Sequence, residues 1–115
     1  MTYFYFISLF FFEIIYNLDE QQFWKACEDG DLEDVGKFLQ NLQLNINWQN
    51  YLGETPFYVA CAKNHIEIVK LLLNEKRIST RKKMNEGKTA IDIAKEEKHS
   101  NIVKLIKEFD TGNHC

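Results

Sequence analysis

Residues of the same type recur along this chain with a fixed step of 34 residues. The matched sets are Ala26, Ala60 and Ala94; Val35, Val69 and Val103; Gly53 and Gly87; Thr55 and Thr89; Cys27 and Cys61; and His65 and His99. A sequence period of about 20–50 residues is typical of proteins built from stacked structural repeats. The pattern therefore predicts a repeat architecture, and it favours a function in binding over one in catalysis.

The copy that begins at Tyr51 shows the start of one repeat most clearly. Gly53 permits the positive φ angle of a tight turn. Thr55 is a good helix N-cap, and Pro56 suits the first helical position, where its missing N–H costs nothing. A short first helix is predicted to follow. Asn64 can adopt the left-handed conformation that ends such a helix.

A second helix is predicted to begin near Ile66. Its apolar residues Ile66, Val69, Leu72 and Leu73 have the spacing of one buried helical face. Both helices of the unit are short, and isolated helices below about 12–15 residues are marginal in water. Each helix must therefore be held by its neighbours, which explains why the unit recurs.

The outer copies share the pattern and are more polar. In the third copy, Thr89 is the expected cap and Asp92 its capping-box partner. The first copy lacks the Thr-Pro start, and Asp19 is its expected cap. Lys25 stands where the other copies are apolar, and Lys95 replaces a cysteine. Polar outer faces are what the terminal repeats of a finite stack require.

Two stretches of the middle copy resemble a known repeat. Residues 53–60, GETPFYVA, are similar to the G-x-T-P-L-H-x-A pattern of ankyrin repeats, and residues 64–73, NHIEIVKLLL, resemble their second-helix pattern G-H-x-x-[VI]-V-x-L-L-L. The resemblance covers about residues 19–109 and is strongest in the second copy. It implies an all-α fold, an ankyrin-type helix-turn-helix solenoid of three stacked repeats with β-turn fingers.

The chain also departs from the family pattern. Tyr58 and Asp92 stand where ankyrin repeats usually have histidine, which alters the family's Thr–His hydrogen bond. Asn64 and Lys98 replace the usual glycine between the helices, and Ala90 replaces proline. The entry to the third copy, residues 78–81, has also lost the character of Ile46-Asn47, so the geometry of the second finger turn is less firmly predicted than that of the first.

The predicted organisation has five segments. Residues 1–17 form a hydrophobic N-terminal segment, residues 18–50 the first repeat and N-cap, residues 51–84 the second repeat, residues 85–109 the third repeat and C-cap, and residues 110–115 a polar tail.

The N-terminal segment does not match the repeats. Eight of its first sixteen residues are aromatic, and Glu13 is their only charged residue. As a helix, residues 1–16 would reach about 24 Å, which is short against a hydrocarbon core of about 30 Å. Three interpretations stay open: a marginal membrane anchor, an apolar segment that packs on the end of the stack, or an upstream extension outside the working protein.

Composition and cysteine usage indicate an ordinary soluble protein. The net charge is -3, with 27% charged and 45% hydrophobic residues, which does not point to nucleic acid. Three cysteines without disulfide-type spacing favour a reducing compartment, and hence a cytoplasmic localisation. We expect Cys27 and Cys61 to fill the core rather than form a bridge, and Cys115 to be the more reactive thiol.

No catalytic residues, metal site or cofactor site emerge from the pattern, and we expect the protein not to be an enzyme. His65 and His99 lie one repeat apart, a distance of about 10 Å, which is too far for two ligands of one ion. The acidic run at residues 28–34 does not match a calcium loop and is interpreted as a solvated turn between helices.

The one basic run covers residues 76–83 and carries five positive side chains. The simplest interpretation is a solvated connector that leads into a fingertip. A nuclear-localisation patch or a phosphate contact is the alternative. The stretch from Lys76 to Ser79 also resembles a site for a basic-directed kinase.

The resemblance implies that fingertip turns and the exposed side of the first helices bind a partner. The candidate partner-binding residues are Trp48, Gln49, Tyr51, Leu52 and Glu54 in the first finger, Lys82, Lys83, Asn85, Glu86 and Lys88 in the second, and Ala62 and Lys63 on the helix surface. Trp48, Tyr51 and Leu52 would form an aromatic tip. Alternatively, Trp48 packs down on the stack and only Tyr51 is exposed.

The predicted function is a non-enzymatic protein–protein interaction module, a monomeric scaffold or adaptor that binds another protein and no small-molecule substrate. The basic second finger suggests an acidic and aromatic partner. Two alternatives remain: a membrane-tethered adaptor anchored by residues 1–16, and a nucleic-acid contact through residues 76–88.

Overall fold

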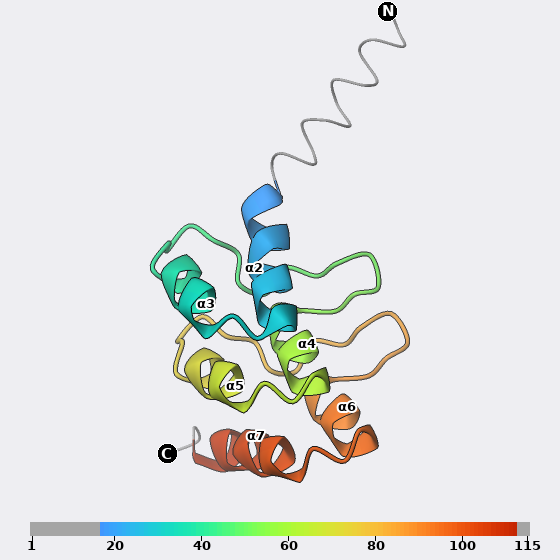
Figure 1. Ribbon diagram of the computed structural model, residues 1–115. Helices are drawn as coiled ribbons and strands as arrows, with labels where there is room; N and C mark the ends of the chain where they lie inside the picture. The colour runs from blue at the N-terminus through green and yellow to red at the C-terminus, as the bar shows by residue number, and fades with distance from the viewer. Residues whose placement is uncertain (1–16, 113–115) are drawn as a thin grey trace, which may run out of the picture.

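The computed structural model describes residues 17–112 and shows three helix pairs stacked in a row (Figure 1). The helices are α2 (Leu18–Asp29), α3 (Leu32–Leu39), α4 (Pro56–Ala62), α5 (Ile66–Leu73), α6 (Ala90–Glu96) and α7 (Ser100–Gly112). Residues 1–16, to which the three interpretations of the N-terminal segment refer, lie outside the described residues, as does Cys115. Within residues 17–112 the secondary structure is helical, which agrees with the predicted all-α solenoid.

The helices form two layers. Helix α4 contacts both α2 and α6 in an inner layer, and α5 contacts both α3 and α7 in an outer layer. Each inner helix also packs on the outer helix that follows it in sequence. Two loops run from the outer layer to the next inner helix and extend as fingers beside the stack (Figure 1). We call residues 48–54 the first finger and residues 82–88 the second finger.

Much of the core consists of residues that the 34-residue step makes equivalent, such as Ala26, Ala60 and Ala94. Cys27 and Cys61 are both fully buried and free, as predicted. Burial raises the pKa of the Cys27 thiol to about 12, and it raises that of Cys61 as well. Both thiols are therefore protonated at neutral pH and act as small apolar side chains.

Two of the three inner helices begin at the predicted caps. The Thr55 side chain accepts a hydrogen bond from the backbone N–H of Tyr58 at 3.0 Å. Thr89 and Asp92 form a complete capping box, because each side chain accepts from the backbone N–H of the other residue. In the third copy this arrangement starts the helix although proline is absent there.

The expected cap of the first copy is wrong. Helix α2 begins at Leu18, its N-cap is Asn17, and Asp19 lies inside the first turn. Asp19 lacks the flanking glycine and proline that Thr55 has, so the sequence carries no comparable turn signal at that point. In the first turn the Asp19 carboxylate still stabilises the helix, because the N-terminal end of a helix carries partial positive charge.

Three residues with left-handed backbone conformation end the inner helices. Gly30, Asn64 and Lys98 have φ angles of 77°, 62° and 62°, and they are related by the 34-residue step. The predicted left-handed stop at Asn64 is confirmed. At Gly30, a Cβ atom would lie only 2.8 Å from the His65 ring, so this site needs glycine for space as well as for conformation.

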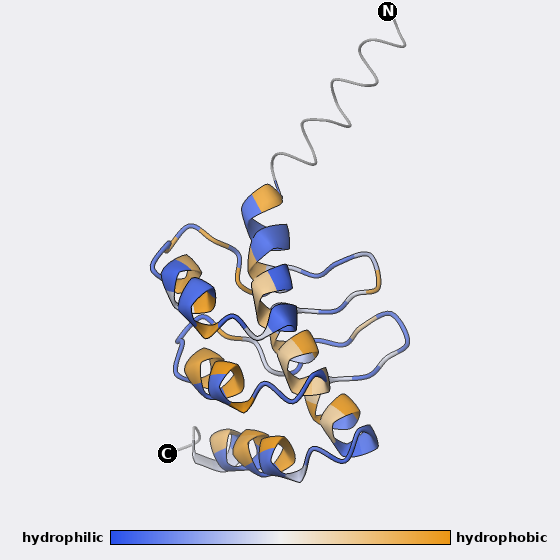
Figure 2. Ribbon diagram, viewed as in Figure 1, coloured by the Kyte–Doolittle hydropathy of each residue, from blue (hydrophilic) through white to orange (hydrophobic). Residues whose placement is uncertain are grey.

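The buried face of α5 differs from the one that the spacing predicts. Ile68, Val69 and Leu72 are buried, whereas Ile66 and Leu73 are only half-buried. Helix α5 lies between α3 and α7 and also packs on α4, so three of its sides meet other helices. In Figure 2 most of the α5 ribbon has the colour of hydrophobic residues, whereas the loops around it are mostly hydrophilic.

Candidate functional site

The first finger is a tight turn held by Asn50. Its side-chain oxygen accepts hydrogen bonds from the backbone N–H groups of Leu52 and Glu54 at 3.0 and 2.9 Å. Gly53 follows with φ 83°, and its N–H donates to the Asn50 carbonyl at 2.8 Å. This turn places Tyr51 and Leu52 at the tip, where they are 87% and 41% exposed.

The two fingers are fastened to each other. The Gln49 side chain donates to the carbonyl of Lys83 at 3.1 Å, and the Asn85 side chain donates to the carbonyl of Tyr51 at 2.9 Å. The backbone N–H of Asn85 also donates to the carbonyl of Leu52 at 2.9 Å. Two of the predicted binding residues, Gln49 and Asn85, therefore hold the fingers in register.

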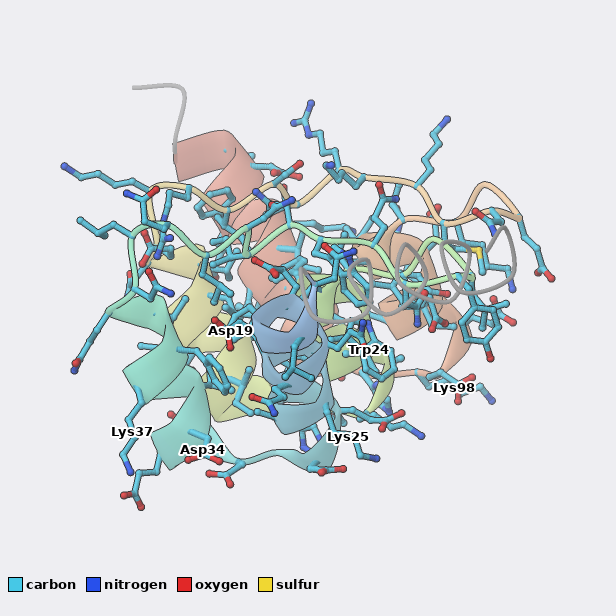
Figure 3. All side chains as sticks on the ribbon, turned by 90° about the horizontal axis from the view of Figure 1, so that it is seen from above. Asp19, Trp24, Lys25, Asp34, Lys37 and Lys98 are labelled. Carbon is cyan, nitrogen blue, oxygen red and sulfur yellow. The ribbon has the colours of Figure 1, made fainter. Side chains whose placement is uncertain are left out.

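Two tryptophans line one open groove between α2 and the first finger. Trp24 projects from α2 toward the loops (Figure 3), and its indole N–H donates to the carbonyl of Glu54 at 3.2 Å. Trp48 is half-buried at the base of the finger. The groove has a volume of about 430 Å³. Its lining residues are Gln21, Trp24, Lys25, Glu28, Trp48, Asn50, Tyr51, Leu52 and Glu54.

Lys25, one of the charged residues that line this groove, forms two ion pairs. Its ammonium lies 2.8 Å from a carboxylate oxygen of Glu28 and 3.3 Å from one of Asp29. The hydrogen bond to Glu28, followed by that to Asp29, raises the pKa of Lys25 and keeps it protonated. The Glu54 carboxylate accepts a hydrogen bond from the Asn50 amide at 3.2 Å.

The remaining predicted binding residues lie outside this groove. Lys82, Lys83 and Glu86 are exposed in the second finger. The ammonium of Lys88 lies 2.8 Å from a carboxylate oxygen of Glu96, and this hydrogen bond raises the pKa of Lys88. Ala62 and Lys63, at the end of α4, are half-buried and exposed, respectively.

Arg77, in the predicted basic run, points into the first repeat. Its guanidinium donates to the backbone carbonyls of Leu39, Asn41 and Leu44 at 3.0, 3.1 and 3.2 Å. Its Nε also donates to the Glu75 carboxylate at 3.0 Å. Arg77 therefore joins two repeats, and it is not available to a phosphate in this arrangement.

The two repeated histidines also join successive repeats. His65 is hydrogen-bonded through Nε2 to the carbonyl of Glu28 at 2.8 Å, and His99 through Nδ1 to the carbonyl of Cys61 at 3.0 Å. Within residues 17–112, no group of three or more potential ligand side chains is arranged to hold a metal ion. No helix in that part of the chain combines the length and apolar character that crossing a bilayer requires.

Trp24 is the largest of the groove residues that the sequence interpretation missed; Gln21, Lys25 and Asn50 are others. Trp24 stands at the position that Tyr58 and Asp92 occupy in the later copies, so the 34-residue step placed it on the side of the inner helix that faces the fingers. Large aromatic residues are also enriched in interfaces. These two signals together could have identified it.

Comparisons with known proteins identify a family and solved structures of similar fold. The family model of ankyrin repeats, in three copies, matches residues 23–113. A solved structure titled as the Bd0816 predatory endopeptidase from Bdellovibrio bacteriovorus in complex with immunity protein Bd3460 contains a chain with a TM-score of 0.70 and 29% identity. The alignment covers 76% of this chain and 45% of that chain, so it spans less than half of the relative. No curated protein matches.

Proposed function

The chain belongs to the ankyrin-repeat family, and we propose that it is a non-enzymatic module that binds another protein through the groove between α2 and the first finger. The observation that carries the proposal is the position of the tryptophans. The chain has only two, and both line this groove beside Tyr51 and Leu52. Tryptophan and tyrosine are enriched among the residues that dominate binding energies.

The rigidity of the first finger supports the proposal. Asn50 fixes the turn from within, and Asn85 fixes it from the neighbouring finger. A surface that is already ordered loses less conformational entropy when a partner binds. The exposed ring of Tyr51 can therefore be buried at low entropic cost, since its backbone is held before binding.

The structural relative supports a protein partner, because the solved structure is a complex of an endopeptidase with an immunity protein. The buried free thiols Cys27 and Cys61 support a reducing, cytoplasmic setting. We do not propose the nucleic-acid alternative, because Arg77 is engaged by the first repeat and the basic run is weaker without it. The membrane alternative rests on residues 1–16, which lie outside the described residues.

The double variant Tyr51→Ala/Leu52→Ala tests the proposal. The full-length protein, immobilised, would be exposed to a lysate of its source cells, and captured proteins would be quantified by mass spectrometry. We expect the variant to capture its specific partner at least about tenfold less well than wild type, because truncation of a central anchor costs about 2 kcal/mol or more.

Leu42→Ala is the matched control, since Leu42 is 76% exposed and does not line the groove. It should capture the same proteins as wild type. Circular dichroism melts of all three proteins should coincide, because none of the changed side chains belongs to the buried core. Equal capture by the wild type and the double variant would refute the proposal.

A further inference from the structure

We propose that the groove between α2 and the first finger accepts a basic side chain, arginine or lysine, of the partner protein. This inference rests on the proposed function and adds the chemistry of the group that is bound. Three features of the groove lead to it: its aromatic walls, the bonding of the Trp24 indole, and the sign of its charge.

The aromatic walls come from three rings. Trp24, Trp48 and Tyr51 line the same groove from α2 and from the first finger. The face of an aromatic ring carries partial negative charge and attracts a cation placed within about 6 Å of its centre, with tryptophan the strongest of the side chains. A groove lined by two tryptophans and a tyrosine therefore suits a cation better than a neutral polar group.

The indole of Trp24 is already held in place. Its only hydrogen-bond donor, the ring N–H, is bonded to the carbonyl of Glu54 at 3.2 Å. This bond fixes the ring against the first finger. Because the donor is occupied, the indole offers a ligand its π surface rather than a hydrogen bond.

The groove has an excess of negative charge. Its charged lining residues are Lys25, Glu28 and Glu54. The ammonium of Lys25 pairs with the carboxylates of Glu28 and Asp29, the latter at 3.3 Å. These two negative charges neutralise its positive charge. Glu54 is bonded only to the neutral amide of Asn50, which leaves its charge uncompensated. An anionic group would meet this carboxylate, whereas a cation would neutralise it.

The position of the charges reverses the expectation of an acidic partner. That expectation came from the basic second finger, but Lys88 is paired with Glu96 and does not line the groove. Lys82 and Lys83 do not line it either. The groove lining holds two carboxylates and one ammonium, and that ammonium is paired with a carboxylate, so the groove itself complements a basic residue.

Tryptophan signals provide a direct test, because both tryptophans of the chain line the groove. The full-length protein would be titrated with the capped peptide acetyl-Gly-Arg-Gly-amide at constant ionic strength. Binding would be followed by tryptophan fluorescence and by the two indole N–H resonances in NMR spectra. The matched peptide replaces arginine by citrulline, which has nearly the same shape and no charge. Lysine and glutamate peptides complete the set.

We expect a saturable response to the arginine peptide, with affinity about five- to tenfold above that of the citrulline peptide. The lysine peptide should also bind more tightly than citrulline, and the glutamate peptide should bind most weakly. Equal affinity for arginine and citrulline, tighter binding of glutamate, or no saturable response to arginine would each overturn the inference.

Glu54→Gln isolates the charge. The change keeps the size of the side chain and leaves the backbone carbonyl that Trp24 uses, so the groove should keep its shape. We expect about fivefold weaker binding of the arginine peptide and unchanged binding of the citrulline peptide. Glu67→Gln, on the exposed side of α5, is the control and should change neither.

The two proposals fail in different ways. If neutral or acidic peptides bind this groove as well as the arginine peptide does, the preference for a basic side chain is refuted, and the proposal that the groove binds a protein still stands. If Tyr51→Ala/Leu52→Ala captures the same proteins as wild type, the proposed function is refuted, regardless of the affinities measured for the peptides.

Discussion

At the scale of single residues, Arg77 does more than any other charged side chain to join two repeats. It donates hydrogen bonds to three backbone carbonyls around the end of α3 and to the carboxylate of Glu75. The C-terminal end of a helix carries partial negative charge, so a cation there is favourable. The Arg77 side chain is 26% exposed, which limits how far water screens these bonds.

We predict that Arg77→Ala lowers the free energy of unfolding by about 2–3 kcal/mol, because carbonyls that bonded to a charged group lose their partner. Arg77→Lys should restore only part of this loss, since one ammonium cannot reach three carbonyls as the planar guanidinium does. Urea unfolding followed by circular dichroism measures both. Lys76→Ala, an exposed neighbour, is the control and should stay within about 0.5 kcal/mol of wild type. A similar small effect for Arg77→Ala would contradict the prediction.

The sequence could not reveal this role of Arg77. It lies in a run with five positive side chains, and such a run is typical of a solvated surface. Where a loop side chain points depends on the path of the loop and on the carbonyls that it finds there, and neither follows from local spacing. The same holds for the groove. Trp24 is recognisable as an aromatic residue on an inner helix, but its bond to the Glu54 carbonyl joins residues 30 positions apart.

At the scale of elements, all three inner helices are ended by a residue with a left-handed backbone conformation, and the residue type differs each time. The position after each helix needs a left-handed backbone, and it is filled by Gly30, Asn64 and Lys98. Glycine adopts this conformation freely and asparagine readily, whereas a lysine does so only at a cost of about 1–2 kcal/mol. The end of α6 is therefore strained, and the end of α2 is not.

We predict that Lys98→Gly stabilises the protein by about 0.5–1 kcal/mol, which is the strain relieved less the extra chain entropy of glycine. Gly30→Ala should destabilise it by more than 1 kcal/mol or so, since the added methyl group would also press on His65. Gly36→Ala is the control within helix α3, where nothing lies within 4 Å of the new methyl group, and it should stabilise by about 0.5–1 kcal/mol. Thermal unfolding of the three variants gives the ranking, and a less stable Lys98→Gly would disprove the assignment of strain.

Element boundaries were predictable where a local signal exists. Thr55 and Thr89 cap their helices because a hydroxyl near the first turn satisfies a free N–H whatever surrounds it. Asp19 has the right chemistry for a cap, but it lacks the flanking glycine and proline of Thr55, and the helix begins before it. Helix α7 runs to Gly112, into the segment expected as a polar tail, and the Thr111 hydroxyl donates hydrogen bonds to the carbonyls of Lys107 and Glu108 in this last part of the helix.

At the scale of the whole molecule, residues of the first repeat close the N-terminal end of the core by packing on each other. The rings of Phe23 and Phe38 meet edge to face with centroids 5.8 Å apart, and Phe23 is fully buried. In the described part of the chain, the buried core extends from Phe23 to Ile106. The 34-residue step predicted this stack because each repeat buries its apolar face on the next one. The step carries no information about residues 1–16, which do not share it.

We therefore predict that deleting residues 1–16 leaves a protein that unfolds cooperatively. The apolar contacts between α2, α3 and α4 all involve residues that the deletion retains. Urea unfolding of the deletion variant should give a single transition with a slope close to that of the full chain, because the slope scales with the surface exposed on unfolding. A deletion through residue 29, which removes α2, is the contrasting variant and should lose the first repeat.

The outcome also separates the three interpretations of the N-terminal segment. If the segment packs on the end of the stack, its removal should lower both the slope and the midpoint, since apolar area buried on folding is lost. If it is a membrane anchor, the midpoint should be unchanged, and the full chain but not the deletion variant should float with lipid vesicles. If it lies outside the working protein, neither measurement should change. A deletion variant with no cooperative transition would refute the prediction that the repeats fold by themselves, because the core from Phe23 to Ile106 would then depend on a segment that the repeat pattern does not include.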